Sequence, residues 1–193
     1  MADADPDLAL LDRWRAGDAD AGNQLFKRHF PSVYKFFEHK TDGEVDDLVQ
    51  ETFLACVNNR ETFRRQSSFR TYLFAIARNV LLGHWRKARG TRPTLDFDEI
   101  SIASLSTSVG TRLTKREDRG RLLAALRALP VEQQILLEMF YWEDLDRDQL
   151  AEVFEVETAT IGSRLYRARA ALQTGLGADD AALDTWARSL ARD

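Results

Sequence analysis

The sequence lacks the features that mark several large classes of protein. Its 193 residues include a single cysteine, Cys56, and the helical spacing of the apolar residues around it predicts a small buried side chain. Four prolines and ten glycines are too few for a low-complexity chain. No apolar run approaches the roughly 20 residues of a membrane span, and residues 1–6 lack a secretory signal pattern. We therefore expect a cytoplasmic protein with no membrane insertion.

The motifs of common enzyme sites are also missing. The histidines, His29, His39 and His84, lie in different segments, and with one cysteine they give no zinc-ligand spacing. The chain has no glycine-rich phosphate loop and no Gly-x-Ser-x-Gly nucleophile turn. A Ser/His/Asp site assembled by folding stays open, but no pattern indicates one. The sequence therefore predicts no cofactor and no enzymatic activity.

What the chain does contain is a core-forming share of apolar residues and one strongly basic segment. It is 44% hydrophobic and 30% charged, with a formal net charge of -4. From Arg60 to Arg92, however, nine Arg and Lys stand against one acid, Glu61. Aromatic residues are interleaved with them: Phe69, Tyr72, Phe74 and Trp85. Such a patch suits a nucleic-acid backbone and unstacked bases, and a solvated basic face over an ordinary core is the alternative.

The first part of the chain is predicted to be helical. Residues 7–40 show helical periodicity that Gly17-Asp18 interrupts, and Pro31 is expected to mark another helix start. An acidic helix is expected from about Val45 to Asn58, with Asp46 and Asp47 in its first turn. Acids at that end also suit the helix dipole, whatever their function.

The basic segment is predicted to hold a loop followed by a helix. Ser67 or Ser68 can cap a helix that begins near Phe69. Arg64 and Arg65 precede the cap, so the loop itself is basic. The helix continues the mixture of aromatic and basic residues through Trp85-Arg86-Lys87.

Three motifs in this order resemble the promoter-opening domain of bacterial sigma factors, most closely the extracytoplasmic-function (ECF) group. They are Asp47-Leu48-Val49-Gln50-Glu51-Thr52-Phe53, Ser67-Ser68-Phe69-Arg70-Thr71-Tyr72-Leu73 and Ile76-Ala77-Arg78-Asn79. The resemblance implies that residues 1–89 form a sigma-two-like domain that docks on core RNA polymerase and recognises and melts the minus-ten element. The core-binding residues it implies are Asp46, Asp47, Leu48, Gln50 and Glu51.

The same resemblance implies a loop that traps a base flipped from the non-template strand, followed by a helix that contacts strand and duplex. The minus-ten residues it implies are Phe63, Arg64, Arg65, Gln66, Ser67, Ser68, Arg70, Arg78, Asn79, His84, Arg86 and Lys87. Arg65 and Gln66 stand where the family usually has Gly and Glu. This departure favours phosphate binding over a defined base identity.

Periodicity is lost from Gly90 to Leu113, where Ser, Thr, Asp and Pro93 dominate. So long a stretch is unusual for a loop inside one domain, and we expect a flexible linker at residues 90–112. The resemblance implies that the linker threads the active-site cleft and RNA exit path of the polymerase. A featureless tether fits the same residues.

A helix-turn-helix is predicted beyond the linker. After a helix at Val131 to Tyr141, Asp146 with Gln149 reads as a cap, and the small Ala151 suits a close helix crossing. The second helix, Thr158 to Gln173, is expected to turn Ile161, Leu165 and Ala168 inward. It carries no acid and has the arginines expected of a major-groove reader, Arg164, Arg167 and Arg169.

Residues 113–175 resemble the minus-thirty-five-binding domain of the same family. The matching motifs are Ala128-Leu129-Pro130, Leu150-Ala151-Glu152 and Thr160-Ile161-Gly162-Ser163-Arg164-Leu165. The resemblance implies DNA contacts at Thr158, Thr160, Ser163, Arg164, Tyr166 and Arg167. Glu155 stands in the turn where Gly is common, so we expect a left-handed backbone at a non-Gly residue. Gly162 stands where Lys or Gln is common, which removes a DNA contact.

The C-terminal tail, residues 176–193, predicts one short amphipathic helix, because Leu183, Trp186 and Leu190 repeat at helical spacing. This helix either caps the second domain or regulates access to it. The tail is the least regular part of the chain after the linker.

The sequence as a whole predicts an all-α fold, with two small helical domains joined by a flexible linker and a helix-turn-helix in the second. We expect a sigma factor whose partners are bacterial core RNA polymerase and promoter DNA, with an anti-sigma factor as a further candidate. The alternative is a stand-alone helix-turn-helix regulator that binds duplex operators as a dimer. The acidic helix and the basic loop argue against that alternative, since a repressor needs neither.

Overall fold

The computed structural model describes residues 6–61, 63, 67–89, 96–105 and 117–177, without the side chains of 117–119. Within these ranges the regular elements are all helices, so the predicted all-α fold is confirmed. They are α1 (Pro6–Arg15), α2 (Ala19–Glu38), α3 (Val45–Asn59), α4 (Phe69–Ala88), α5 (Ile102–Leu105), α6 (Glu117–Ala128), α7 (Val131–Tyr141), α8 (Arg147–Phe154) and α9 (Thr158–Leu176).

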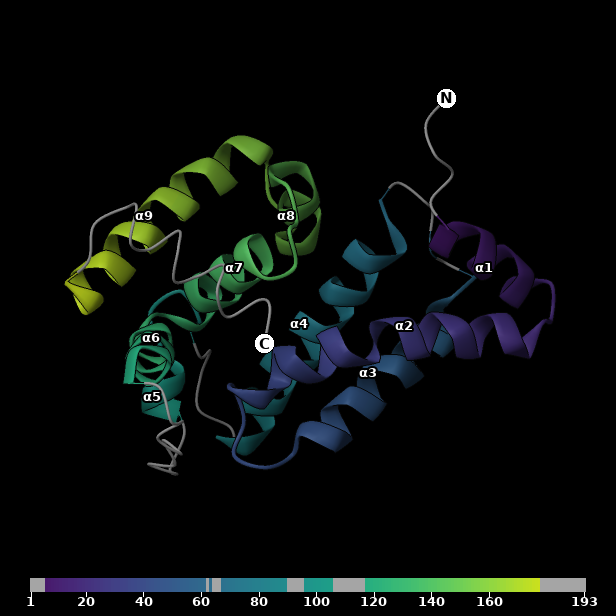
Figure 1. Cartoon of the computed structure of the whole chain (residues 1–193), viewed down its shortest axis with the longest axis horizontal. Helices are drawn as coiled ribbons and strands as arrows, with labels where there is room; N and C mark the ends of the chain where they lie inside the picture. The colour runs from purple at the N-terminus through teal and green to yellow at the C-terminus, as the bar shows by residue number, and fades with distance from the viewer. Residues whose placement is uncertain (1–5, 62, 64–66, 90–95, 106–116, 178–193) are drawn as a thin grey trace.

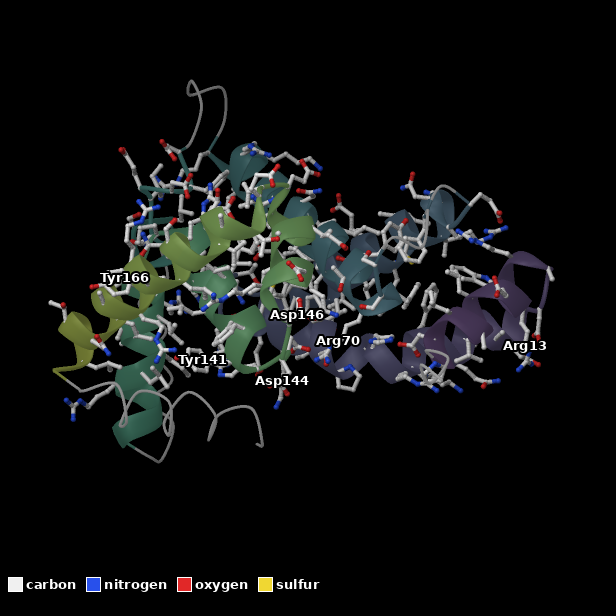
Figure 2. The ribbon with its side chains drawn as sticks, turned by 90° about the horizontal axis from the view of Figure 1, so that it is seen from above. Arg13, Arg70, Tyr141, Asp144, Asp146 and Tyr166 are labelled. Carbon is white, nitrogen blue, oxygen red and sulfur yellow. The ribbon has the colours of Figure 1, made fainter. Side chains whose placement is uncertain are left out.

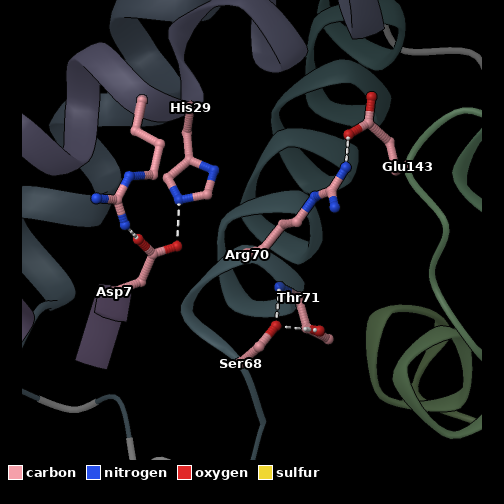
Figure 3. Close-up of polar contacts among 7 residues, drawn as sticks. Asp7, His29, Ser68, Arg70, Thr71 and Glu143 are labelled. Carbon is pink, nitrogen blue, oxygen red and sulfur yellow. Dashed lines mark hydrogen bonds and ion pairs between the residues drawn. The ribbon is translucent and has the colours of Figure 1, made fainter. Parts of the chain in front are cut away.

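The helices form two groups (Figure 1), which we call the first domain (α1–α4) and the second domain (α6–α9). The break between α1 and α2 falls where the sequence predicts it: Gly17 has φ of 100°, and the Asp18 carboxylate accepts a hydrogen bond from Ala21 N at 3.1 Å. Asp7 of α1 is tied to α2, because its carboxylate contacts Arg28 and lies 2.6 Å from His29 Nε2 (Figure 3).

The predicted helix start at Pro31 is wrong, because α2 runs unbroken through that residue. A proline inside a helix removes one backbone hydrogen bond and costs about 3 kcal/mol. Burial of a large apolar side chain gives about 1.5–3 kcal/mol. Three such side chains after Pro31 lie in the core, Val33, Phe36 and Phe37, and their burial outweighs the cost of the proline.

Helices α3 and α4 pack on α2 and complete the first core. The inner stripe of α3 includes Cys56, which is fully buried as predicted. Ser68 is the N-cap of α4: its hydroxyl accepts a hydrogen bond from Thr71 N at 3.0 Å (Figure 3). The predicted cap and helix start are therefore confirmed.

Part of the predicted linker has a fixed place. Phe97, Ile102 and Leu105 are buried although their spacing follows no period. The start of α7 has no side-chain cap, and its first N–H groups instead donate to this segment: Val131 N to Ile100 O at 2.9 Å and Glu132 N to Phe97 O at 3.1 Å. Residues 96–105 thus cap α7, whereas residues 90–95 and 106–116 lie outside the described ranges.

The second domain contains the predicted helix-turn-helix. Asp146 and Gln149 form a complete capping box at the start of α8. Glu155 closes α8 with φ of 54° and ψ of 45°, so the expected left-handed turn residue is confirmed. The inward side chains of α9 are those predicted, Ile161, Leu165 and Ala168.

The two domains pack against each other along α4 and α8, which lie side by side in the middle of the molecule. Among the described helices, none is both long and apolar enough to cross a membrane.

Candidate polymerase and nucleic-acid interfaces

The outer face of α3 is acidic and exposed. Asp46, Asp47, Gln50 and Glu51 all point outward, while Leu48 is only 3% exposed and belongs to the inner stripe. The helix keeps this orientation because its other side, with Leu48, Val49, Thr52 and Cys56, is buried in the first core. Four of the five residues predicted to bind polymerase therefore form one accessible face.

An exposed apolar patch that the sequence analysis missed continues this face. Leu54 is 57% exposed and lies three and seven residues after Glu51 and Asp47, on the same side of α3. Phe30 of α2 is 45% exposed and stacks on Phe53, with ring centroids 6.4 Å apart. The helical spacing of Leu54 was visible in the sequence, whereas the approach of Phe30 depends on how α2 packs against α3.

The start of the basic loop is held by the first domain. Arg15 of α1 donates to Arg60 O at 2.9 Å and to Phe63 O at 2.7 Å. Phe63 is buried and stacks on Tyr72, with ring centroids 4.5 Å apart. The predicted DNA residues Arg64, Arg65 and Gln66 lie outside the described ranges. Arg15 was missed, because contacts over 45 and 48 residues leave no local signal.

The predicted residues of α4 fall on two sides of the helix. Asn79, Arg86 and Lys87 are exposed, and Ser67, Ser68 and His84 are half-buried. Lys87 Nζ lies 4.0 Å from Glu51 Oε1, so the basic end of α4 is next to the acidic face of α3. The guanidinium of Arg86 lies 5.2 Å from the ring centroid of Phe97, beside the linker.

Arg70 and Arg78 instead face the second domain. Arg70 pairs with Glu143, just after α7 (Figure 3). Arg78 pairs with Glu132 in α7, with Nε donating to Oε2 at 2.9 Å and a second nitrogen contacting the other oxygen. A third pair, between Lys40 and Glu138, is almost fully buried. We call Lys40–Glu138, Arg70–Glu143 and Arg78–Glu132 the interdomain ion pairs.

Burial dominates the electrostatics of the Lys40–Glu138 pair. Loss of water lowers the pKa of the Lys40 amine, and the charge of Glu138 opposes this shift. Loss of water likewise raises the pKa of the Glu138 carboxyl, opposed by the charge of Lys40. Gln134 donates a further hydrogen bond to Glu138 at 2.7 Å. The pair is satisfied only while the two domains are in contact.

The recognition helix α9 is open to solvent along its predicted reading face. Tyr166 is 76% exposed, and Figure 2 shows it well apart from Arg70. Ser163 and Arg167 are exposed, while Thr160 and Arg164 are half-buried. The hydroxyl of Thr158 donates to Asp148 at 2.8 Å.

The side chains around the helix-turn-helix turn are acidic. A shallow surface hollow there is lined by Asp148, Glu152, Glu155 and Glu157 together with Ala151, Val156, Thr158 and Thr160. These carboxylates repel DNA phosphates next to the reading face. In the part of the chain that the structure describes, no group of three or more His, Cys, Asp or Glu is placed to hold a metal ion.

Comparison with protein families gives two matches. The model for sigma-70 region 2 matches residues 25–91, and the model for sigma-70 region 4 matches residues 119–172. Two curated relatives are 28% identical to the chain. The ECF RNA polymerase sigma-E factor of Haemophilus influenzae aligns over 180 residues, 88% of this chain and 94% of that protein. The ECF RNA polymerase sigma factor BldN of Streptomyces coelicolor aligns over 164 residues, 83% of this chain and 62% of that protein.

Two solved structures share the fold. CnrH in complex with the cytosolic domain of CnrY has a TM-score of 0.65 at 23% identity, covering 92% of this chain and all of that one. RpoE of Bartonella quintana, in complex with the anti-sigma factor NepR, has a TM-score of 0.63 at 21% identity and covers 81% and 97%. The shared fold extends over most of this chain in both comparisons.

Proposed function

Because the chain belongs to the extracytoplasmic-function sigma factors, which direct promoter-specific initiation by bacterial RNA polymerase, we propose that its two domains divide this work between them. Residues 1–89 dock on core polymerase and open the minus-ten element, residues 113–175 read the minus-thirty-five element, and residues 90–112 connect them. The protein acts in the cytoplasm and carries out no covalent chemistry. RNA synthesis belongs to the polymerase.

The observation that supports this division most is that the first domain carries an acidic surface and a basic surface next to each other. The acidic face of α3 suits a basic protein surface, while the basic end of α4 suits DNA. The approach of Lys87 to Glu51 makes the two surfaces neighbours. A domain with this arrangement can hold DNA at the edge of the protein it docks on.

Polymerase docking involves Asp46, Asp47, Gln50 and Glu51, and Leu54 adds apolar contact area at the end of the same face. Leu48 supports the face from the core. On the DNA side, Asn79, Arg86 and Lys87 are accessible, and Ser68 fixes the start of the helix that carries them. In the second domain, Thr160, Ser163, Arg164 and Arg167 share one face of α9 and are proposed to contact bases or phosphates.

Charge reversal on α3 tests polymerase docking. Asp47→Lys with Glu51→Lys should abolish co-purification with core polymerase, because both charges change sign on the exposed face. Asp20→Lys with Glu38→Lys, which changes two exposed acids of α2 in the same domain, is the matched control and should bind as wild type. Unchanged core binding by the α3 variant would remove the docking role from this face.

An anti-sigma factor is a further candidate partner. The solved RpoE neighbour is bound to one, and a protein of that class would inhibit this chain by covering the α3 face. The stand-alone regulator is not favoured, because such a protein has no use for the region 2 match at residues 25–91.

A further inference from the structure

The face of α4 that meets the second domain carries two arginines proposed to bind minus-ten DNA. Arg70 and Arg78 lie eight residues apart, on the same side of the helix as the buried Phe74. The guanidinium group of each forms an ion pair with a glutamate of the second domain. The second domain therefore covers these guanidinium groups in the free chain.

The contact at Arg78 uses the donors that a DNA phosphate would use. Two nitrogens of its guanidinium meet the two carboxylate oxygens of Glu132, the same forked geometry by which arginine binds phosphate. The Arg78 guanidinium also lies over the ring of Phe154 in α8, with its carbon 4.9 Å from the ring centroid. With the side chain only 14% exposed, a DNA strand cannot reach these donors while Glu132 holds them.

The other two interdomain ion pairs fix the same arrangement. Arg70 is one-third exposed and pairs with Glu143, which is itself buried. Lys40, after α2, pairs with Glu138 of α7, and both side chains are almost fully buried. Three glutamates of one short segment, residues 132–143, thus meet three basic side chains of the first domain.

The rest of the proposed DNA surface is not covered in this way. Asn79, Arg86 and Lys87 are exposed on α4, and the reading face of α9 is open. The contact between domains is therefore selective: it occupies Arg70 and Arg78 and leaves the recognition helix free.

Resting on the minus-ten function proposed for the first domain and on the DNA role that the sequence resemblance implies for Arg70 and Arg78, we propose that the second domain inhibits the first in the free protein. Glu132 and Glu143 occupy the guanidinium donors that single-stranded promoter DNA requires, so the domains must separate before the strand binds. The glutamate carboxylates and the DNA phosphates are both negative and bind a guanidinium group with similar geometry, so a phosphate can replace a carboxylate directly. Docking of the two domains at separate places on polymerase would complete the release.

The test uses the full-length chain with Glu132→Gln and Glu143→Gln, which keep the shape of both side chains and remove their charge. Small-angle X-ray scattering measures domain separation, and fluorescence anisotropy measures affinity for a labelled 12-nucleotide single strand of mixed sequence. We expect a larger radius of gyration and binding at least about fivefold tighter, the gain if the closed form holds about four-fifths of the molecules or more. A matched control, Asp20→Asn with Glu44→Gln, removes two exposed acids that lie outside both the interdomain contact and the acidic hollow, and should change neither value.

A second variant separates release from DNA contact. Arg78→Glu places a like charge against Glu132, so it should also enlarge the radius of gyration, yet it should gain no affinity for the strand because the cation is gone. An unchanged radius in the Glu132/Glu143 variant would overturn the proposed contact. A larger radius with unchanged affinity in that variant would instead overturn the inhibition and the minus-ten role of these arginines, while leaving the interdomain contact in place.

Discussion

Removal of Lys40 should destabilise the protein by more than any surface charge does. Its side chain is 0% exposed and its ammonium contacts Glu138, which is 3% exposed. In Lys40→Met the apolar stem is kept, but Glu138 is left with Gln134 as its donor. Breaking a buried pair by removing one partner costs about 3–5 kcal/mol, because the remaining charge is uncompensated. We expect a loss of that size at pH 8, up to the limit set by the free energy that holds the two domains together.

The loss should shrink as the pH falls. Burial raises the pKa of Glu138 in the folded chain, and without Lys40 nothing of opposite charge opposes the shift. A carboxyl whose pKa is higher in the folded state destabilises the fold at high pH. That penalty disappears as the pH falls through the folded pKa, because the folded state then takes up the proton. Lys40→Met should therefore approach wild-type stability at pH 5.

The double variant Lys40→Met, Glu138→Leu completes a double-mutant cycle with wild type and the two single variants. A well-packed apolar pair in place of a buried ion pair is neutral or stabilises by about 1–4 kcal/mol, so the double variant should be at least as stable as wild type. Urea unfolding followed by circular dichroism and tryptophan fluorescence gives the four free energies if the transitions coincide. Lys35→Met, at an exposed position, is the control and should stay within about 0.5 kcal/mol. A cost below about 1 kcal/mol for Lys40→Met, or single costs that simply add, would refute the reasoning.

Two further predictions concern single side chains. Gly162→Ala should stabilise the second domain by up to about 1 kcal/mol in thermal unfolding, because a Cβ there meets no atom within 4 Å and glycine disfavours a helix interior; a loss of stability would show that the glycine is needed for packing. Burial raises the pKa of the Cys56 thiol to about 12, so Ellman's reagent at pH 8 should label the native protein far more slowly than the urea-unfolded one, and equal rates would contradict the buried position.

Features set by neighbouring residues could be predicted from the sequence. The cap at Ser68, the capping box at Asp146 and the left-handed Glu155 each depend on a few adjacent positions, and all three are confirmed. The predicted ends of α3 and α7 agree with the structure to within one residue, whereas α9 continues to Leu176, beyond the predicted end at Gln173. Pro31 was misread because local backbone chemistry favours a helix start there, whereas the buried face of α2 decides the outcome.

Features set by tertiary contact could not be predicted in this way. Phe97, Ile102 and Leu105 have no common period, so the burial of these linker residues could not be predicted from the sequence. Arg70 and Arg78 were expected to face DNA, but their partners lie 73 and 54 residues further along the chain. Basic composition identifies a surface with high affinity for anions; it does not distinguish a phosphate from a glutamate of the same protein.

The nature of the interdomain ion pairs suits a contact that must open. Moving two charges out of water costs about as much as their attraction returns, so such pairs fix an arrangement of the domains more than they add net stability. Separation of the domains returns Arg78 and Glu132 to water, where both are well solvated, and neither is left buried alone. The closed form can therefore be specific and still be displaced by polymerase and DNA. In Lys40→Met the same opening returns Glu138 to water, so the free energy of domain opening sets the upper limit on the cost of that substitution.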